Sequence, residues 1–227
     1  MANPLVNSPV HPLLMEPLQR PFRRALPHDG PRGRALFVDR DGVMNRLIIA
    51  GYVRTPEELE LLPESLEALR IVATETDYKI VLFTNQSVVG RGDIPRRTLE
   101  AIHQRMLEAV EAAGGRFDLL QVCAHAPYMQ CDCRKPRPGM LYEAAEVLHL
   151  DLTQCWTIGD SVRDIVAGKT AGTRVGFIRA QGWHDEKEWD RIQKEDHSVD
   201  FVAHDLLEAV RQVREYDSRG ITAENLR

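Results

Sequence analysis

Two aspartates close the first apolar run of the chain and are candidates for chemistry. Ala35 to Val38 is apolar, and Asp39 and Asp41 follow it at alternate positions. Alternate residues of an extended chain point the same way, so the two carboxylates can face one metal ion or one substrate. Gly42 comes next and permits a sharp turn of the backbone. A turn without chemistry has the same composition, since turns favour both Asp and Gly.

Polar side chains also follow three further apolar runs. They are Thr84 and Asn85 after residues 79–83, Arg134 and Lys135 after residues 117–123 and the cysteines beyond them, and Asp160 and Asp164 after residues 155–158. The carboxyl ends of parallel strands meet at one edge of an α/β sheet, where such folds have their sites. Four polar strand ends in succession therefore favour a catalytic site over four unrelated turns.

A cluster of cysteines and one histidine lies directly before Arg134 and Lys135 in the sequence. Its members are Cys123, His125, Cys131 and Cys133. Three thiolates and one imidazole form a closed tetrahedral set that suits structural zinc, whereas a disulfide between Cys131 and Cys133 would be strained. Inert buried cysteines are the alternative. Because Arg134 and Lys135 follow Cys133 directly, we expect the zinc-bound loop to fix both cations and to have no catalytic role.

Apolar runs alternate with helical patterns along the chain. The expected helices are residues 56–76, 95–113, 138–148, 161–170 and 205–213, with a loop or surface helix at 184–198. This alternation predicts an α/β, Rossmann-like three-layer fold with a mostly parallel sheet covered on both faces. No insertion is long enough for a large cap domain.

The length of 227 residues suits one domain with appendages. Residues 1–33 hold seven of the 13 prolines and are expected to form an extended arm, residues 34–213 the domain, and residues 214–227 a tail. A net charge of −5 argues against nucleic acid as a partner. With no export signal and no apolar run of about 20 residues, we expect a cytoplasmic monomer that does not engage a membrane.

The polar strand ends together resemble the haloacid dehalogenase superfamily of phosphotransferases over residues 34–213. The matching motifs are Asp39-Arg-Asp-Gly-Val43, Thr84-Asn85, Lys135 and Gly159-Asp-Ser-Val-Arg-Asp164. The resemblance implies that Asp39 attacks phosphorus and forms an aspartyl-phosphate. Asp41 then protonates the leaving group and later activates water, a role for which we expect a raised pKa.

The same resemblance implies a catalytic magnesium ion. Its expected ligands are Asp39, the backbone carbonyl of Asp41, and Asp160. The expected phosphate- and substrate-binding residues are Thr84, Asn85, Arg134, Lys135, Gly51, Tyr52 and Arg91. Asp164 is left open between a metal contact through water, orientation of Lys135, and a helix acid in the first turn.

The cysteine cluster and the stretch from Cys133 to Met140 narrow the resemblance to the zinc-containing histidinol-phosphatase and heptose-bisphosphatase branch. The implied activity is magnesium-dependent hydrolysis of a small sugar bisphosphate, with zinc in a structural role. Arg134, Arg91 and Arg137 suit a second phosphate, because guanidinium forks match phosphate oxygens.

Three alternatives stay open. The five-residue spacer between His125 and Cys131 resembles histidinol-phosphate phosphatases, and Ser161 stands where the heptose enzyme has lysine. A non-catalytic phosphoacceptor domain also combines acids, a threonine and a lysine, although Asp41 and the cysteine cluster argue against it. A zinc-stabilised binding module fits the acidic composition and the four-part site poorly.

Overall fold

Six short apolar segments pair into a single sheet in the computed structural model, which describes residues 32–49, 51–179, 183–195 and 197–219. The strands are β1 (Ala35–Val38), β2 (Lys79–Asn85), β3 (Leu119–Cys123), β4 (Trp156–Gly159), β5 (Arg174–Ile178) and β6 (Phe201–Ala203). Their order is β3-β2-β1-β4-β5-β6, and all five pairings are parallel. The predicted parallel α/β sheet is therefore confirmed.

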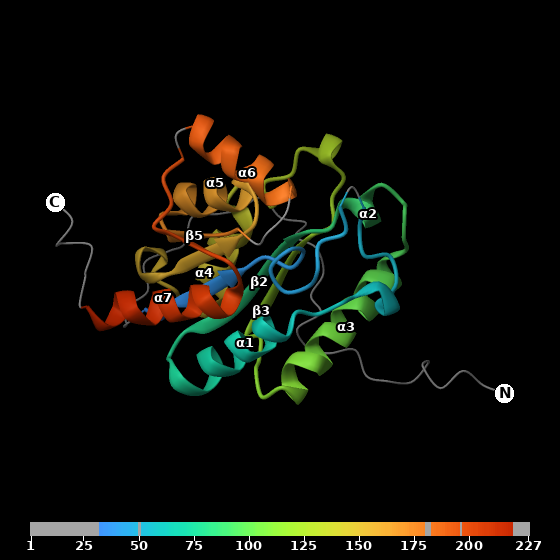
Figure 1. The fold of residues 1–227 in the computed structure, drawn as a ribbon. Coiled ribbons are helices and arrows are strands. Elements are labelled where there is room, and N and C mark those ends of the chain that lie inside the picture. The colour runs from blue at the N-terminus through green and yellow to red at the C-terminus, as the bar shows by residue number, and fades with distance from the viewer. Residues whose placement is uncertain (1–31, 50, 180–182, 196, 220–227) are drawn as a thin grey trace.

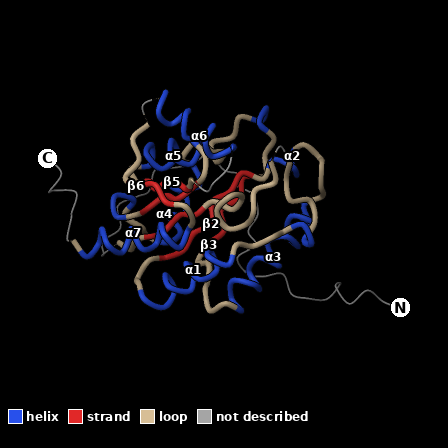
Figure 2. Tube along the Cα trace, viewed as in Figure 1, coloured by secondary structure: helices blue, strands red, loops and turns tan. Residues whose placement is uncertain are grey.

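Helices cover both faces of this sheet (Figures 1 and 2). They are α1 (Pro63–Glu75), α2 (Ser87–Gly90), α3 (Arg96–Ala112), α4 (Gly139–Leu148), α5 (Val162–Ala171), α6 (Trp183–Lys194) and α7 (Leu206–Ser218), with short 3-10 helices η2 (Pro56–Glu58), η3 (Pro127–Met129) and η4 (Leu152–Gln154). Helices α1, α3 and α7 pack on one face, and α4, α5 and α6 on the other. The result is the three-layer arrangement expected from the alternating pattern.

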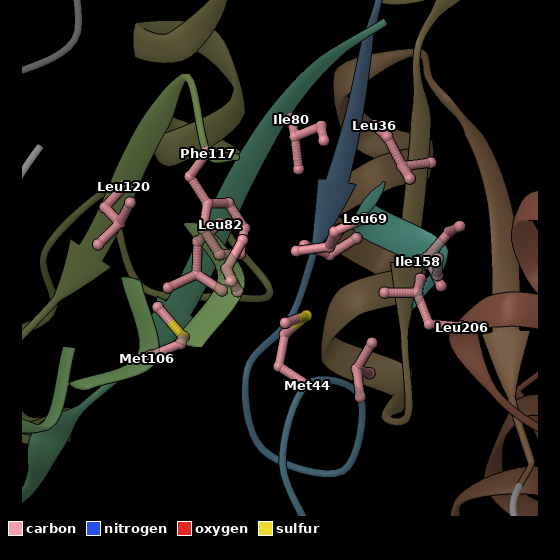
Figure 3. Close-up of a cluster of buried hydrophobic side chains, with 14 of the residues drawn as sticks. Leu36, Met44, Leu69, Ile80, Leu82, Met106, Phe117, Leu120, Ile158 and Leu206 are labelled. Atoms are coloured by element: carbon pink, nitrogen blue, oxygen red, sulfur yellow. The ribbon is translucent and has the colours of Figure 1, made fainter. Parts of the chain in front are cut away.

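Alternation along the strands explains the two cores. Leu36 and Ile80 face the layer of α1, α3 and α7, whereas Phe37 and Val81 face α4. Figure 3 shows strand leucines and isoleucines packed against Leu69 of α1 and side chains of α3 and α7. Both faces of the central strands are thus buried, and only the strand ends remain for polar chemistry.

The expected helix over residues 56–76 is wrong in its first third, residues 56–62. The chain forms the single turn η2, passes through an extended Leu62, and begins α1 at Pro63. Proline in a helix interior lacks an amide donor and clashes with the preceding turn, but it suits the first helical position. The restart at Pro63 leaves residues 45–62 as the connection that carries the loop beside the site.

The ends of the domain differ from the expected boundaries. Gly33, assigned to the arm, already exchanges backbone hydrogen bonds with His149 and Asp151. Helix α7 continues to Ser218, so residues 214–218 are helical rather than part of a tail. The rest of the expected arm, apart from Arg32, and residues 220–227 lie outside the described residues.

One smaller difference concerns the segment after β2, which forms the one-turn helix α2 that the sequence pattern did not predict. The charged segment that was left open between a loop and a surface helix is the helix α6. Among the described residues, no helix combines the length and apolar character that a bilayer crossing requires.

Candidate active site

A cavity of about 300 Å³ opens at the carboxyl ends of β1, β2 and β4. It is lined by Asp39, Asp41, Leu47, Ile48, Ile49, Gly51, Tyr52, Thr84, Asn85, Ser87, Arg134, Lys135, Asp160, Ser161 and Arg163. Nine residues expected at a site from the sequence therefore meet here. The strand ends bring them together although they are separated by up to about 120 positions in the chain.

Asp39 shares a buried lysine with a second carboxylate. The Nζ atom of Lys135 lies 2.9 Å from Asp39 Oδ1 and 2.6 Å from Asp164 Oδ1, and it donates to the Phe83 carbonyl at 3.0 Å. Burial raises the pKa of Asp39 to about 6, with the charges of Asp164 and Asp41 adding to the effect and Lys135 opposing it. Burial alone would lower the pKa of Lys135, but Asp164 and Asp39 raise it, so the ammonium stays charged.

Asp164 performs two of the three roles left open by the sequence. One carboxylate oxygen pairs with Lys135. The other accepts hydrogen bonds from the Ser161 backbone amide at 3.1 Å and from the Ser161 hydroxyl at 2.6 Å, which closes a capping box at the start of α5. Ser161 thus has a structural reason of its own at the position after Asp160.

Asp41 is held by a different set of donors. Arg40 Nη2 lies 2.9 Å from both carboxylate oxygens, Asn45 Nδ2 donates to Oδ1 at 3.1 Å, and Gln86 Nε2 donates to Oδ2 at 2.9 Å. Burial raises the pKa of Asp41, but the charge of Arg40 and these hydrogen bonds outweigh it and lower the pKa below its usual value. The expectation of a raised pKa is therefore wrong for this arrangement, since every partner stabilises the ionised form.

The end of β2 connects both sides of the site. Gln86 also donates to the Thr84 hydroxyl at 2.9 Å, so Thr84 and Asp41 share one amide. The Asn85 side chain donates to the Lys135 carbonyl and accepts from the Lys135 amide, each at 3.1 Å. Asn85 therefore fixes the backbone of Lys135 as well as lining the cavity.

The turn after β1 brings Asp160 against the first motif. Gly42 has a φ of +82°, and a Cβ there would lie 2.0 Å from Asp160 Oδ2, so only glycine fits. Carboxylate oxygens of Asp39, Asp160 and Asp164 lie within 4.8 Å of one another. Asp164 uses both carboxylate oxygens, one with Lys135 and one with Ser161, whereas the contacts of Asp39 with Lys135 and with the Arg40 amide both use Oδ1. Asp39 and Asp160 are therefore the pair that fits a hard, oxygen-preferring cation with few protein ligands.

The cysteine cluster assembles as its spacing predicts. The Sγ atom of Cys131 lies 3.6 Å from that of Cys123 and 3.4 Å from that of Cys133, and His125 Nδ1 lies 3.2 Å from Cys133 Sγ. These separations are far longer than a disulfide bond and close to the roughly 3.8 Å between sulfurs around tetrahedral zinc. Hydrogen bonds, led by that from Cys133, lower the pKa of the Cys123 thiol, whereas burial raises the pKa of Cys131 and the hydrogen bond with Cys123 raises that of Cys133. The three thiols and the imidazole therefore fit zinc by their type and spacing, and Cys155 is not among them, since its Sγ contacts the Ala35 amide and the Asp151 carbonyl.

Of the arginines predicted to bind substrate, Arg134 lines the cavity and Arg91 does not. Arg134 lines the cavity, and its buried Nη1 atom has no hydrogen-bond partner among the described residues. Arg91 is absent from the cavity lining: its guanidinium pairs with Asp93, donates to Ser87 Oγ at 2.7 Å and lies 4.6 Å from the Tyr52 ring centroid. Arg134 is thus positioned to meet an anion, whereas Arg91 supports the cavity wall at Tyr52.

Sequence reasoning missed several residues at the site. Arg163 is exposed, lines the cavity and lies in the first turn of α5, where the helix dipole disfavours a cation. A cation at this unfavourable position could have indicated from the sequence that Arg163 serves in binding rather than in helix stability. Leu47, Ile48 and Ile49 belong to the loop after β1 and carried no comparable signal. Gln86 is buried at a strand end beside Thr84, but its contact with Asp41 could not be derived from its type alone.

Comparison with known proteins assigns the class. A family model described as HAD-hydrolase-like matches residues 132–209. A bacterial relative from Pseudomonas aeruginosa is 40% identical over 144 residues, which span 63% of this chain and 80% of that protein. The chain therefore belongs to the HAD-like hydrolases.

The relatives themselves carry one name. The Pseudomonas aeruginosa protein is a D-glycero-beta-D-manno-heptose-1,7-bisphosphate 7-phosphatase, as is a Bordetella bronchiseptica protein 41% identical over 146 residues, spanning 64% of this chain and 80% of that protein. The crystal structure of D,D-heptose 1,7-bisphosphate phosphatase from B. bronchiseptica, complexed with magnesium and phosphate, is 35% identical and has a TM-score of 0.72. It aligns with 80% of this chain and 98% of its own.

Proposed function

We propose that this protein is a magnesium-dependent phosphatase that removes the 7-phosphate of D-glycero-D-manno-heptose 1,7-bisphosphate. The observation that carries the proposal is the placement of Asp39. Its carboxylate lines the cavity, 2.9 Å from the ammonium of Lys135 and within 4.8 Å of a carboxylate oxygen of Asp160. A nucleophile beside a fixed cation and a metal-binding acid is what displacement at a charged phosphoryl group requires.

In the first step, an Asp39 carboxylate oxygen attacks phosphorus. The bond between phosphorus and the ester oxygen breaks, and its electron pair leaves with that oxygen. Asp41, protonated at this stage, gives its proton to the leaving oxygen and releases the sugar alcohol. Lys135 and the Thr84 hydroxyl hold the non-bridging phosphoryl oxygens while the charge moves.

In the second step, water hydrolyses the aspartyl-phosphate. Asp41, now ionised, takes a proton from the water as its oxygen attacks phosphorus. The acyl-phosphate bond breaks, inorganic phosphate leaves, and Asp39 is restored as a carboxylate. The low pKa of Asp41 in the resting arrangement suits this base role, and the phosphate dianion of the substrate is the group that must raise it for the acid role.

Two metals belong to the proposal. Asp39, the Asp41 carbonyl and Asp160 would hold Mg²⁺, which neutralises charge on the transferring phosphoryl group when bound. The cysteine cluster (Cys123, His125, Cys131 and Cys133) would hold structural zinc. Since Lys135 lies two residues after Cys133, that zinc would fix the loop that delivers the lysine.

The choice of a bisphosphate depends on a second cationic position. Arg134 presents a buried Nη1 atom with no partner among the described residues, and Arg163 lines the same cavity. Their guanidinium groups suit a phosphate at the far end of a bound sugar, and the curated relatives are named for such a substrate. Histidinol phosphate is the second candidate, favoured by the short spacer between His125 and Cys131.

A substrate comparison tests the proposal. With Mg²⁺ present, kcat/KM is measured for the heptose bisphosphate, heptose 1-phosphate and histidinol phosphate, and the released position is read by phosphorus NMR. We expect fastest cleavage at the 7-position of the bisphosphate and almost none of the 1-phosphate. Faster cleavage of histidinol phosphate would contradict the choice of substrate while leaving the phosphatase chemistry intact.

A matched pair of variants refines this test. Arg134→Gln should lower kcat/KM for the bisphosphate by about 10- to 100-fold, because a charge-assisted contact is lost. Arg97→Gln, at an exposed position on α3 outside the cavity, is the control and should leave kcat/KM unchanged. Equal effects of the two substitutions would remove Arg134 from substrate recognition.

The proposed setting is a cytoplasmic monomer. The four thiols of the described chain are unpaired, and such thiols persist in a reducing compartment. Size-exclusion chromatography with light scattering checks the monomer, and a stable dimer would contradict it.

A further inference from the structure

Arg40 separates the two catalytic aspartates in the sequence but turns away from the cavity. Its side chain is fully buried and is not among the cavity-lining groups. Burying a guanidinium is unfavourable unless charged and polar partners surround it. The carboxylate partner of the guanidinium is Asp41, both of whose oxygens accept from it. The Arg40 backbone amide separately donates to Asp39 Oδ1 at 2.7 Å.

The far side of the guanidinium meets a histidine from helix α3. Arg40 Nη1 lies 3.3 Å from His103 Nε2, and the His103 ring is 3% exposed. Burial, together with the charge of Arg40, lowers the pKa of His103 to about 3, so the ring is neutral. Because a guanidinium can only donate, Nε2 accepts this hydrogen bond and the ring proton resides on Nδ1. His103 thereby attaches Arg40 to the helical layer.

We propose that Arg40, anchored by His103, is a positioning residue that fixes the Asp41 carboxylate for proton transfer to the leaving oxygen. The inference depends on the acid/base role proposed for Asp41. Asn45 and Gln86 each donate one hydrogen bond to Asp41, but among the described residues only Arg40 contacts both of its oxygens. A planar fork sets both the position and the tilt of a carboxylate, which a single donor cannot do.

The position of the Asp41 carboxylate matters for the transfer of one proton, from Asp41 to the leaving oxygen. As the bond between Asp39 and phosphorus forms and the ester bond breaks, the Asp41 proton moves to the departing alkoxide oxygen. An alkoxide cannot leave without that proton, whereas p-nitrophenolate leaves unprotonated. Displacing Asp41 therefore slows the first step for sugar phosphates and has little effect on it for p-nitrophenyl phosphate.

The experiment compares the two leaving groups in the full-length enzyme with Mg²⁺. The measured quantity is kcat/KM, which covers steps up to departure of the leaving group and excludes hydrolysis of the aspartyl-phosphate. The alkyl substrate is the heptose bisphosphate, or histidinol phosphate if the enzyme prefers it. The variants are Asp41→Asn, Arg40→Lys, His103→Leu and His103→Gln, with folding checked by thermal unfolding.

We expect Asp41→Asn and Arg40→Lys to lower kcat/KM for the alkyl ester by about 10- to 100-fold and for p-nitrophenyl phosphate by less than about threefold. His103→Leu should show the same selectivity more weakly, and His103→Gln, which keeps an acceptor for Arg40, should restore most of the activity. If Arg40→Lys does not fold, the two His103 variants carry the test.

Two results would overturn the positioning role. Equal losses on both substrates in Arg40→Lys and His103→Leu would mean that the pair only supports packing, and no loss on either would mean that Asp41 does not need it. If Asp41→Asn itself shows no selectivity, the acid role in the proposed function fails, and the positioning role fails with it. The Asp41 variant thus separates the two failures.

Discussion

Asp39 and Asp41 stand two positions apart at the end of β1, yet their surroundings shift their carboxyl pKa values in opposite directions. Asp39 shares the single ammonium of Lys135 with Asp164, and burial dominates, so its pKa rises to about 6. Asp41 accepts hydrogen bonds from the Arg40 guanidinium and from the side-chain amides of Asn45 and Gln86, and these contacts lower its pKa. The number of donors per carboxylate, rather than burial alone, decides the direction.

The groups that hold Asp39 and the groups that hold Asp41 also belong to different parts of the molecule, and we call them the Asp39 side and the Asp41 side. Lys135 arrives on the loop that follows the cysteine cluster, and Asn85 holds its backbone. Arg40 is attached through His103 to helix α3 in the opposite layer. The side-chain anchor of each carboxylate can therefore be removed without removing the anchor of the other.

The most damaging change to the Asp39 side is removal of the nucleophile. Asp39→Asn should lower kcat by about 10³-fold or more, because no aspartyl-phosphate can form. Lys135 keeps its partner Asp164, so the thermal unfolding midpoint should stay close to that of the wild type. Steady-state kinetics and trapping of the phosphoenzyme check this, with Asp151→Asn, outside the cavity lining, as the control. Substantial turnover by Asp39→Asn would end its assignment as nucleophile.

Disrupting the cysteine cluster should lower activity less than removing Asp39 does. We expect about one zinc ion per chain by elemental analysis, and its loss in the double variant Cys131→Ser and Cys133→Ser. Activity should fall about 10- to 100-fold, since the loop that places Lys135 is released.

The matched control is Cys155→Ser, which removes the cysteine outside the cluster. It should retain zinc and activity. A double variant that is free of zinc and fully active would show that Asp39 and Lys135 do not depend on the cluster.

The contrast between the two sides also explains what could be predicted from the sequence. Residues that follow apolar runs, such as Asp39 and Thr84, are brought to one edge by the topology of a parallel sheet, so their meeting was predictable. The cysteine cluster was predictable from spacing, since its ligands are close in the chain.

Contacts between distant elements were not predictable in this way. Arg40 and His103 are 63 positions apart, and His103 lies on the apolar face of α3 among Ile102 and Met106, so no spacing in the sequence connects them. Asp41 was assigned a raised pKa because only its burial was foreseen. The break in the helix at Pro63, by contrast, followed from a residue type that the periodicity of neighbouring leucines obscured.

A last prediction concerns the histidine behind Asp41, whose effect appears in stability at acid pH rather than in turnover. His103 has a pKa of about 3 in the folded protein, against about 6.5 for histidine in an unfolded chain. Its contribution is fully present above about pH 6.5 and is lost as pH falls toward 3, because only the unfolded state binds the proton. Between about pH 6 and 4, the free energy of unfolding should therefore fall by about 1.4 kcal/mol per pH unit from this site.

His103→Gln removes this proton, so denaturant titrations at several pH values should give a correspondingly shallower acid slope. His204→Gln, at an exposed position, controls for the loss of an imidazole. Identical slopes in the wild type and His103→Gln would show that the imidazole behind Arg40 is not held neutral. The hydrogen bond from Arg40 would then lose its acceptor, and the Asp41 side would have no separate anchor in α3.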